Sequence, residues 1–204
     1  DLKLKELPRH IECFDNSNFQ GSYPVASMVV FKDGKPANKE YRHFKIKTVE
    51  GPNDFASMEE IVYRRYKRLL EEQKPLPQLI LIDGGKGQLS AAVESLKKTG
   101  IYERVAVAGI AKKLEEIYVP NDPYPLHIDK RSASLRLLQH IRNEAHRFAI
   151  TFHRQLRSKG TFKSGLENIP GIGEKTAQKL LTTFKSIANI RQADEQDLKK
   201  VLNE

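Results

Sequence analysis

The chain has 204 residues, of which 39% are hydrophobic and 30% charged, a balance typical of a globular protein and too apolar for a disordered tail. A single cysteine, Cys13, excludes an intrachain disulfide framework and a zinc site built from several cysteines. The net charge of +9 favours a polyanionic partner such as nucleic acid, although many proteins without one are also mildly basic.

The composition also bears on location. The apolar runs are only a few residues long, so we expect no membrane-spanning segment and no membrane partner. The first ten residues, DLKLKELPRH, lack the apolar core of a signal peptide, which favours a cytoplasmic setting.

Strands are predicted first along the chain. Residues 10–15 (HIECFD) alternate apolar and polar side chains, and residues 25–32 (VASMVVFK) are rich in β-branched and aromatic types. A turn signal at 33–36 (DGKP) leads to a third strand candidate at 40–47 (EYRHFKIK). Strands joined by a turn of this chemistry are typical of an antiparallel hairpin.

Helices and strands are predicted to alternate in the middle of the chain. Helical spacing of the apolar residues indicates a helix over 55–72, which two prolines end. Residues 79–83 are almost entirely apolar, as in a parallel strand buried on both faces. A helix from about 88 to 98 and a strand near 105–110 continue this pattern.

The last third is predicted to be helical and basic. After a polar hairpin or surface loop at 111–133, an amphipathic helix is expected from about Ser134 to Arg157. Residues 158–164 have the composition of a basic linker, and residues 165–184 indicate a helix, a tight glycine hairpin and a second helix. We therefore expect an α/β domain, a linker and a small all-α domain.

Asp15 and Asp83 each end a predicted strand. The carboxyl edge of an α/β sheet is where ligands and reacting groups collect. Two carboxylates held close together repel each other unless a cation lies between them, and a divalent metal bound through oxygen atoms is the usual solution. Each aspartate also fits a simpler interpretation as a turn residue, before Asn16-Ser17-Asn18 and before Gly84-Gly85.

The segment 84–88 (GGKGQ) resembles a phosphate-binding loop, because backbone amides that converge before a helix attract anions. It is not a nucleotide-hydrolysing P-loop, since neither Gly87 nor Gln88, which follow Lys86, has the hydroxyl that binds Mg²⁺ in such a loop. A contact between Lys86 and a DNA phosphate fits better. The alternative is a plain turn between a strand and a helix.

Three other features also have a purely structural interpretation. His146, one turn after Arg142 on the long helix, fits a packed histidine, a metal ligand or a proton carrier. Asp54 precedes the helix at 55–72, where it would be a good N-cap. The basic residues of that helix fit either a binding face or a solvated face balanced by nearby acids: Arg64, Arg65, Lys67 and Arg68.

The most specific local pattern is IPGIGEKTA at 169–177. A hairpin with glycines at alternate positions exposes backbone N–H groups at a helix N-terminus, where they grip a phosphate without reading bases. Basic residues in the following helix add salt-dependent attraction. The residues expected to bind DNA here are Gly171, Gly173, Lys175 and Lys179.

Together these segments resemble the C-terminal half of the UvrC family, the incision subunit of the bacterial excinuclease of nucleotide excision repair. The matching stretches cover almost the whole chain in order: CFDNSN, VAS, GPNDFASM, LILIDGGKGQL, LLQHIRNEAHRFAI and NIPGIGEKTA. The resemblance implies a ribonuclease H-like endonuclease domain over 1–157, with a mixed sheet flanked by helices. The basic linker over 158–164 would then lead to a helix-hairpin-helix DNA-binding domain over 165–204.

The resemblance also implies an activity, the cutting of the damaged strand on the 5′ side of a lesion. It implies that Asp15, Asp83 and His146 form the active site and hold Mg²⁺ or Mn²⁺, and it implicates the acid at the position of Asp54. The partners it implies are double-stranded DNA with a lesion and, for the full-length protein, UvrB.

The chain departs from the family pattern in two places. The family often has FDISH where this chain has FDNSN, so that Asn18 replaces a histidine near the site. The family usually carries two hairpin motifs, whereas here one is clear and the chain stops before a second is expected to form. The resemblance implies that the half that makes the 3′ cut and the segment that contacts UvrB lie outside this chain.

Two other functional classes fit parts of the sequence. A non-catalytic DNA-binding module would show the same charge and the same hairpin. A phosphate-loop nucleotide enzyme would bind ATP through Lys86, although the missing hydroxyl argues against it.

Overall fold

The computed structural model describes residues 2, 4, 6–17, 25–49, 53–111, 116–166, 169–184 and 187–202. Asn18, which departs from the family pattern, lies outside the described residues. The chain divides into two compact units, Asp1–Phe152 and His153–Glu204, and each is described by itself. Within the described ranges, no helix combines the length and the apolar character needed to cross a membrane.

A mixed seven-stranded sheet forms the centre of the first unit. Its strands are β1 (His10–Ser17), β2 (Val25–Lys32), β3 (Lys35–Pro36), β4 (Arg42–Lys45), β5 (Leu79–Asp83), β6 (Ala106–Ala111) and β7 (Glu116–Tyr118). The order across the sheet is β3-β2-β1-β5-β6-β7, and β4 also pairs with β2. The central strands β1, β5 and β6 are parallel, and the others add antiparallel neighbours.

The strand pairings confirm the predicted hairpin and the predicted buried strand. β2 and β4 are antiparallel, with β3 and a short 3-10 helix (Asn38–Glu40) between them. In β5 the first four residues are buried, because helices cover both faces of the sheet at this strand. The polar segment after β6 contains β7, which pairs with β6 as the edge of the sheet.

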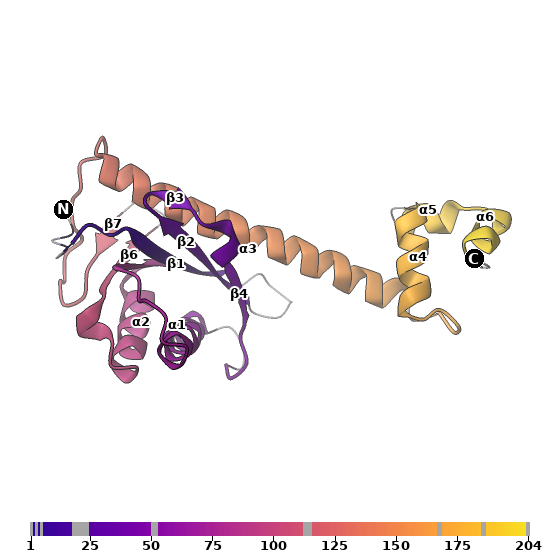
Figure 1. The fold of residues 1–204 in the computed structure, drawn as a ribbon. Coiled ribbons are helices and arrows are strands. Elements are labelled where there is room, and N and C mark those ends of the chain that lie inside the picture. Colours follow the sequence, from indigo (N-terminus) through magenta and orange to yellow (C-terminus); the bar gives the residue numbers. More distant parts are fainter. Residues whose placement is uncertain are drawn as a thin grey trace. The chain divides into compact units, whose positions relative to one another are not determined.

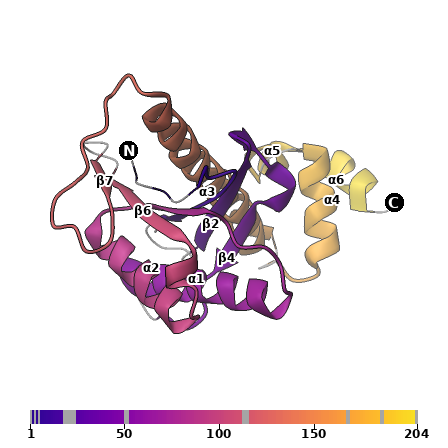
Figure 2. The same ribbon diagram turned by 60° about the vertical axis from the view of Figure 1, so that its left-hand side comes forward.

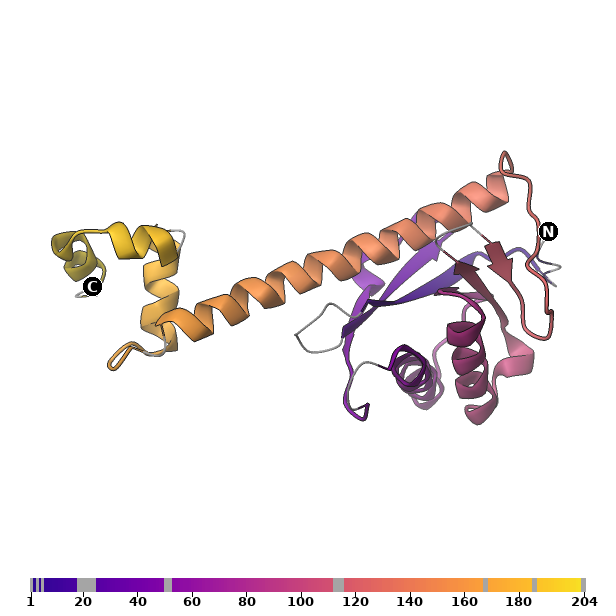
Figure 3. The same ribbon diagram turned by 180° about the vertical axis from the view of Figure 1, so that it is seen from behind.

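Helices lie on both faces of the sheet (Figure 1). Helices α1 (Asp54–Glu71) and α2 (Lys86–Lys98) pack side by side on one face (Figure 2). The first part of α3 (Ala133–Leu166) crosses the other face (Figure 3). The apolar stripe of α1 is buried against the sheet and comprises Met58, Ile61, Val62, Tyr66 and Leu69.

Helix α3 is longer than the sequence predicted. It was expected to end at Arg157, but it continues to Leu166, through the residues 158–164 that were expected to form a linker. The expectation rested on the basic composition of this stretch, which also contains Gly160. One glycine inside a helix costs only about 1 kcal/mol relative to alanine, so the helical pattern around it prevails.

Aromatic stacking and apolar burial hold α3 on the sheet. Leu138, Ile141 and Ala145 are buried in the core of the first unit. Further along the helix, the His43 ring of β4 stacks between two phenylalanines, with ring centroids 3.9 Å from Phe148 and 4.0 Å from Phe152. The predicted apolar stripe is therefore confirmed, and it fixes the position of the helix turn that carries His146.

The second unit begins with the end of α3 and continues with α4 (Glu174–Phe184), α5 (Ile187–Gln192) and α6 (Glu195–Leu202). The two predicted helices are present, one on either side of the turn at residues 169–173. This unit has a core of its own, formed by Leu166, Ala177, Leu180 and Ile190.

A second pair of helices forms where none was expected. Helix α5 is joined to α6 by Ala193 and Asp194, and Leu198 and Val201 of α6 pack against the core of the second unit. The Asp194 carboxylate accepts a hydrogen bond from the backbone N–H of Asp197 at 2.9 Å and caps α6. The expectation looked for a glycine hairpin, and this connection uses an aspartate cap instead.

Candidate metal centre

Asp15 and Asp83 lie next to each other at the carboxyl edge of the parallel strands. They are register partners in the pairing of β1 with β5, so their side chains leave the sheet on the same face. β1 continues to Ser17 in its antiparallel pairing with β2. Asp15 therefore lies within a strand, and its interpretation as a turn residue is wrong. Asp83 is the last residue of β5.

Helix α3 brings His146 to these two carboxylates. Nδ1 of His146 lies 3.3 Å from Oδ2 of Asp15, although the two residues are 131 positions apart in the sequence. One ligand atom from each of the three residues lies within 4.8 Å of the other two. Asp15 is buried, whereas Asp83 and His146 are half-buried. An ion from solution would therefore approach the group past Asp83 and His146.

The three side chains fit a divalent metal ion. The two carboxylates supply oxygen ligands and two negative charges, and the imidazole supplies a neutral nitrogen ligand. A cation between the carboxylates relieves the repulsion that their proximity creates. The oxygen atoms suit Mg²⁺ and Mn²⁺, and the nitrogen atom shifts the preference towards Mn²⁺.

Cys13 lies in β1 two residues before Asp15 and is fully buried. Burial, followed by the negative charges of Asp83 and Asp15, raises the pKa of its thiol well above the usual value, and the charge of Arg142 opposes this only in part. The thiol is therefore protonated at neutral pH and does not compete as a thiolate ligand.

Ser27 is a residue near the site that the sequence interpretation missed. Its hydroxyl is buried and donates a hydrogen bond of 3.1 Å to the backbone oxygen of Ala145, the residue before His146. Ser27 is also the register partner of Asp15 in the pairing of β1 with β2. This one bond therefore joins the strand beside Asp15 to the turn of α3 that carries His146. The signals for it were a single serine in the apolar strand VASMVVFK and its place in the VAS stretch that matches the family.

Asp54 has a different place from the one predicted. The cap of α1 is Asn53, whose side chain accepts a hydrogen bond of 3.0 Å from the backbone N–H of Ala56, and Asp54 is the first residue of the helix. The side-chain amide of Asn16 donates a hydrogen bond of 3.0 Å to the backbone oxygen of Asp54. The start of α1 is thus tied to the residue after Asp15, but Asp54 is not a member of the group of three possible ligands.

Lys86 is the first residue of α2, two residues earlier than the predicted start of that helix. Its ammonium group donates a hydrogen bond to the backbone oxygen of Pro123 and lies 5.4 Å from the centre of the Tyr118 ring. In this structure Lys86 therefore joins the glycine loop to the segment after β7.

In the second unit, the predicted hairpin is present. Gly171 has a φ of +88°, a conformation that favours glycine. Gly173 precedes α4 and its backbone oxygen accepts a hydrogen bond of 2.9 Å from the N–H of Ala177. A Cβ atom at Gly173 would meet nothing within 4 Å, so internal packing does not require a glycine there. Lys175 is exposed and Lys179 is half-buried.

The basic residues of α1 form ion pairs. Arg64 pairs with Glu60, Arg68 pairs with Glu72, and the Lys67 ammonium lies over the Tyr63 ring. Arg65 lies 2.6 Å from the buried carboxylate of Glu12. Arg64 and Arg68 therefore fit the interpretation as a solvated face balanced by nearby acids, whereas Arg65 points inward to a buried acid of β1.

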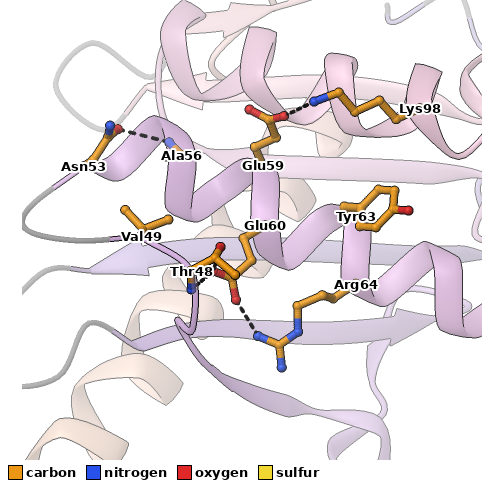
Figure 4. Close-up of a pocket in the computed structure, with 9 residues that line it drawn as sticks. All are labelled: Thr48, Val49, Asn53, Ala56, Glu59, Glu60, Tyr63, Arg64 and Lys98. Atoms are coloured by element: carbon orange, nitrogen blue, oxygen red, sulfur yellow. Dashed lines mark hydrogen bonds and ion pairs between the residues drawn. The ribbon is translucent and has the colours of Figure 1, made fainter.

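An open groove of about 810 Å³ runs along α1, away from the three possible ligands. Its charged side chains pair with each other, Glu59 with Lys98 and Glu60 with Arg64 (Figure 4). The Glu60 carboxylate also accepts hydrogen bonds from the backbone N–H and the hydroxyl of Thr48. The hydrogen bonds of Glu60 fasten the segment after β4 to α1, and the Glu59–Lys98 pair joins α1 to α2.

Comparison with known proteins identifies two regions of the chain. Residues 1–150 match the family described as the UvrC RNase H endonuclease domain. Residues 163–203 match the family described as the SAM-like helix-hairpin-helix tandem, in agreement with the presence of α5 and α6 after α4.

Several curated relatives carry the name UvrABC system protein C. The protein of Flavobacterium johnsoniae is 61% identical over 202 residues, and that of Chlorobaculum tepidum is 52% identical over 200 residues. These alignments cover 99% and 98% of this chain but only 34% and 32% of the relatives. The chain thus spans about a third of their length.

Among solved structures, endonuclease V of Ciona intestinalis in complex with inosine-containing DNA has a TM-score of 0.37 and 21% identity, covering 53% of this chain and 48% of that one. The catalytic domain of human endonuclease V has a TM-score of 0.35 and 21% identity, covering 52% and 46%. Similarity at this level carries no conclusion about the site. The matches over residues 1–150 and 163–203 show that the chain belongs to the UvrC family, with an RNase H-like endonuclease domain followed by a helix-hairpin-helix domain.

Proposed function

We propose that this chain is a divalent-metal-dependent endodeoxyribonuclease that makes the 5′ incision beside a lesion in nucleotide excision repair. The observation that carries the proposal is the group formed by Asp15, Asp83 and His146 at the carboxyl edge of the sheet. This group lies within the region that matches the endonuclease domain of the UvrC family.

We propose that the two aspartates hold one Mg²⁺ or Mn²⁺ ion through their carboxylates, with Mn²⁺ bound more tightly. When bound, such an ion lowers the pKa of a water molecule and neutralises charge on the phosphate oxygens. One ion is expected in the chain alone, because two carboxylates and a neutral imidazole balance one divalent charge. A second ion would arrive with the substrate.

In this proposal His146 is either the third ligand or the group that moves a proton. Its contact with Asp15 supports both roles, because a proton on Nδ1 would be donated to the carboxylate and leave Nε2 as an acceptor. Asp54 would assist at the same edge of the sheet. This role is supported by the finding that Asn53, not Asp54, caps α1.

Binding of lesion-containing double-stranded DNA is proposed for the glycine loop and the second unit. The hairpin at Gly171 and Gly173 would hold a phosphate at the start of α4, and Lys175 and Lys179 would add attraction that weakens with salt. Lys86 would reach a phosphate by leaving the Pro123 carbonyl. UvrB is proposed as the partner of the full-length protein.

The proposal is tested by replacing either carboxylate with an amide of the same shape. Asp15→Asn and Asp83→Asn should abolish Mn²⁺-dependent incision of a lesion-bearing duplex and leave DNA binding unchanged, because the hairpin lies in the other unit. Asp33→Asn is the matched control, since Asp33 is an exposed turn residue that pairs with Arg9. Asparagine tolerates its positive φ, so this variant should cut normally. Incision that survives in both site variants would leave only a DNA-binding module.

A further inference from the structure

Phe55 is a large apolar residue that remains exposed to solvent in the folded first unit. It is the second residue of α1, and 54% of its surface is exposed. A single exposed apolar residue is ordinary on a protein surface and needs no explanation by itself. The position of the Phe55 ring provides a second observation, because a residue of another helix makes room for it.

The ring of Phe55 rests on the backbone of Gly87 in the first turn of α2. A Cβ atom at Gly87 would lie 2.4 Å from Cε1 and 2.7 Å from Cζ of the ring, closer than real Cβ atoms approach other atoms. Gly87 has no positive φ, so its backbone conformation does not require a glycine. The ring therefore occupies the space that a side chain at Gly87 would fill.

This ring lies at the edge of the sheet that carries the proposed metal centre. Asp54, the residue before Phe55, receives the hydrogen bond of Asn16, which directly follows Asp15. Gly87, against which the ring lies, is four residues after Asp83. The start of α1 is thus in contact with both segments that follow the two carboxylates.

We propose that Phe55 is a stacking platform for one base of the DNA strand that is cut. A rigid aromatic face is what an unpaired base requires, and stacking of this kind tolerates any sequence because every base has a flat apolar face. Such tolerance suits an enzyme that must cut beside damage in any sequence context. The inference rests on the proposed nuclease function and adds a binding residue to it.

The test is a double-mutant cycle between the ring and the DNA. The probe is a duplex with a central unpaired bubble, in which one base at a time is replaced by an abasic sugar, and binding is measured without divalent metal so that nothing is cut. Phe55→Ala should weaken binding of the intact probe by roughly 5- to 150-fold, the value of one stacked base. At one position, removal of the base should have no further effect in this variant.

Matched variants separate stacking from other causes. Phe55→Trp should retain the affinity and Phe55→Leu should not, because leucine keeps the apolar character but lacks a flat face. Leu70→Ala is the control, since Leu70 is an exposed apolar residue near the other end of the same helix. It should leave DNA binding unchanged.

Gly87→Ala tests the seat itself. The added methyl group should displace the ring and lower DNA affinity, whereas in the Phe55→Ala background the same change should have no effect on binding. The stacking role would be overturned if, at every abasic position, the loss of binding free energy from Phe55→Ala added to the loss from removing the base. A Phe55→Leu variant that binds DNA normally would also overturn it. These binding measurements need no metal. If the chain failed to cut DNA, the proposed nuclease function would be overturned, but the binding data would still show whether Phe55 stacks on a base.

Discussion

Glu12 shows how the first unit tolerates a fully buried charge. Its carboxylate receives hydrogen bonds from Arg65 at 2.6 Å and from the Tyr66 hydroxyl at 2.9 Å, and His10 lies 3.4 Å away. Burial alone would raise the pKa of Glu12, but His10 and Arg65 outweigh this effect and hold the pKa below its usual value. The carboxylate is therefore ionised in the folded protein at neutral pH.

Replacement of Arg65 should destabilise the first unit strongly. We expect Arg65→Leu to lower the free energy of unfolding by about 3–5 kcal/mol at neutral pH, because it leaves a buried carboxylate without its cation. Arg68→Leu is the matched control on the same helix, and it should have little effect because the Arg68–Glu72 pair is exposed. Urea denaturation of both variants checks this. An equal loss of unfolding free energy in the two variants would show that burial of the Arg65–Glu12 pair does not matter.

The pH dependence of the same variant has a defined sign. A pKa lowered on folding adds stability above the unfolded value near 4.5, and this stability is lost as the pH falls through the folded value. Without Arg65, only His10 would oppose the effect of burial, so the folded pKa of Glu12 should be higher than in wild type and the variant should lose less stability on acidification. The gap between wild type and variant should narrow below about pH 4.5.

Ser27 is predicted to position His146. Ser27→Ala should lower the free energy of unfolding by about 0.5–1.5 kcal/mol and also weaken Mn²⁺ binding, because Ala145 loses the bond that holds its turn of α3. Ser95→Ala is the control, since Ser95 is a buried serine that donates to the backbone oxygen of Glu59 in α1. It should lose similar stability without a change in Mn²⁺ affinity by calorimetry. Equal Mn²⁺ affinity in the two variants would remove Ser27 from the site.

At the scale of elements, local patterns predicted the strands and helices of the first unit well. The alternation at β1, the apolar run at β5 and the helical spacing in α1 each follow from one local period, and all three are confirmed. Element ends were less predictable. The end of α3, the cap of α1 and the start of α2 depend on which of several neighbouring residues completes the hydrogen bonding, and composition does not decide that.

The hairpin before α4 allows a separation of stability from DNA binding. Gly173→Asp should stabilise α4, because aspartate is a better N-cap than glycine. It should also weaken DNA binding and flatten its salt dependence, because it puts a negative charge where a phosphate is proposed to bind. Gln192→Glu adds the same charge at the exposed end of α5 and serves as the control. Unchanged binding by Gly173→Asp would exclude the hairpin from the DNA interface.

At the scale of the whole molecule, the site could not be assembled from spacing alone. Asp15, Asp83 and His146 come from two strands and a helix, and only the sheet register and the packing of α3 bring them together. From spacing alone, a role in a turn was the simpler interpretation of each aspartate. The resemblance to a family supplied the grouping, and Ser27, which no motif marked as functional, emerged only from the three-dimensional contacts.

Each unit has its own apolar core, which predicts that the units fold separately. A fragment of residues 1–157 should fold and bind Mn²⁺ as the whole chain does. Its DNA affinity should be lower and less dependent on salt, because the hairpin and its lysines are missing. Circular dichroism, calorimetry and DNA titration at several salt concentrations check these points. A fragment that binds DNA as the whole chain does would place the main DNA contacts in the first unit.

The most direct measurement is anomalous diffraction from a crystal of this chain soaked in Mn²⁺. We predict one strong peak, with an oxygen atom of Asp15, an oxygen atom of Asp83 and a ring nitrogen of His146 each at about 2.1 Å from it. A peak that none of these side chains touches, or two equally strong peaks in the absence of DNA, would contradict the proposed metal centre.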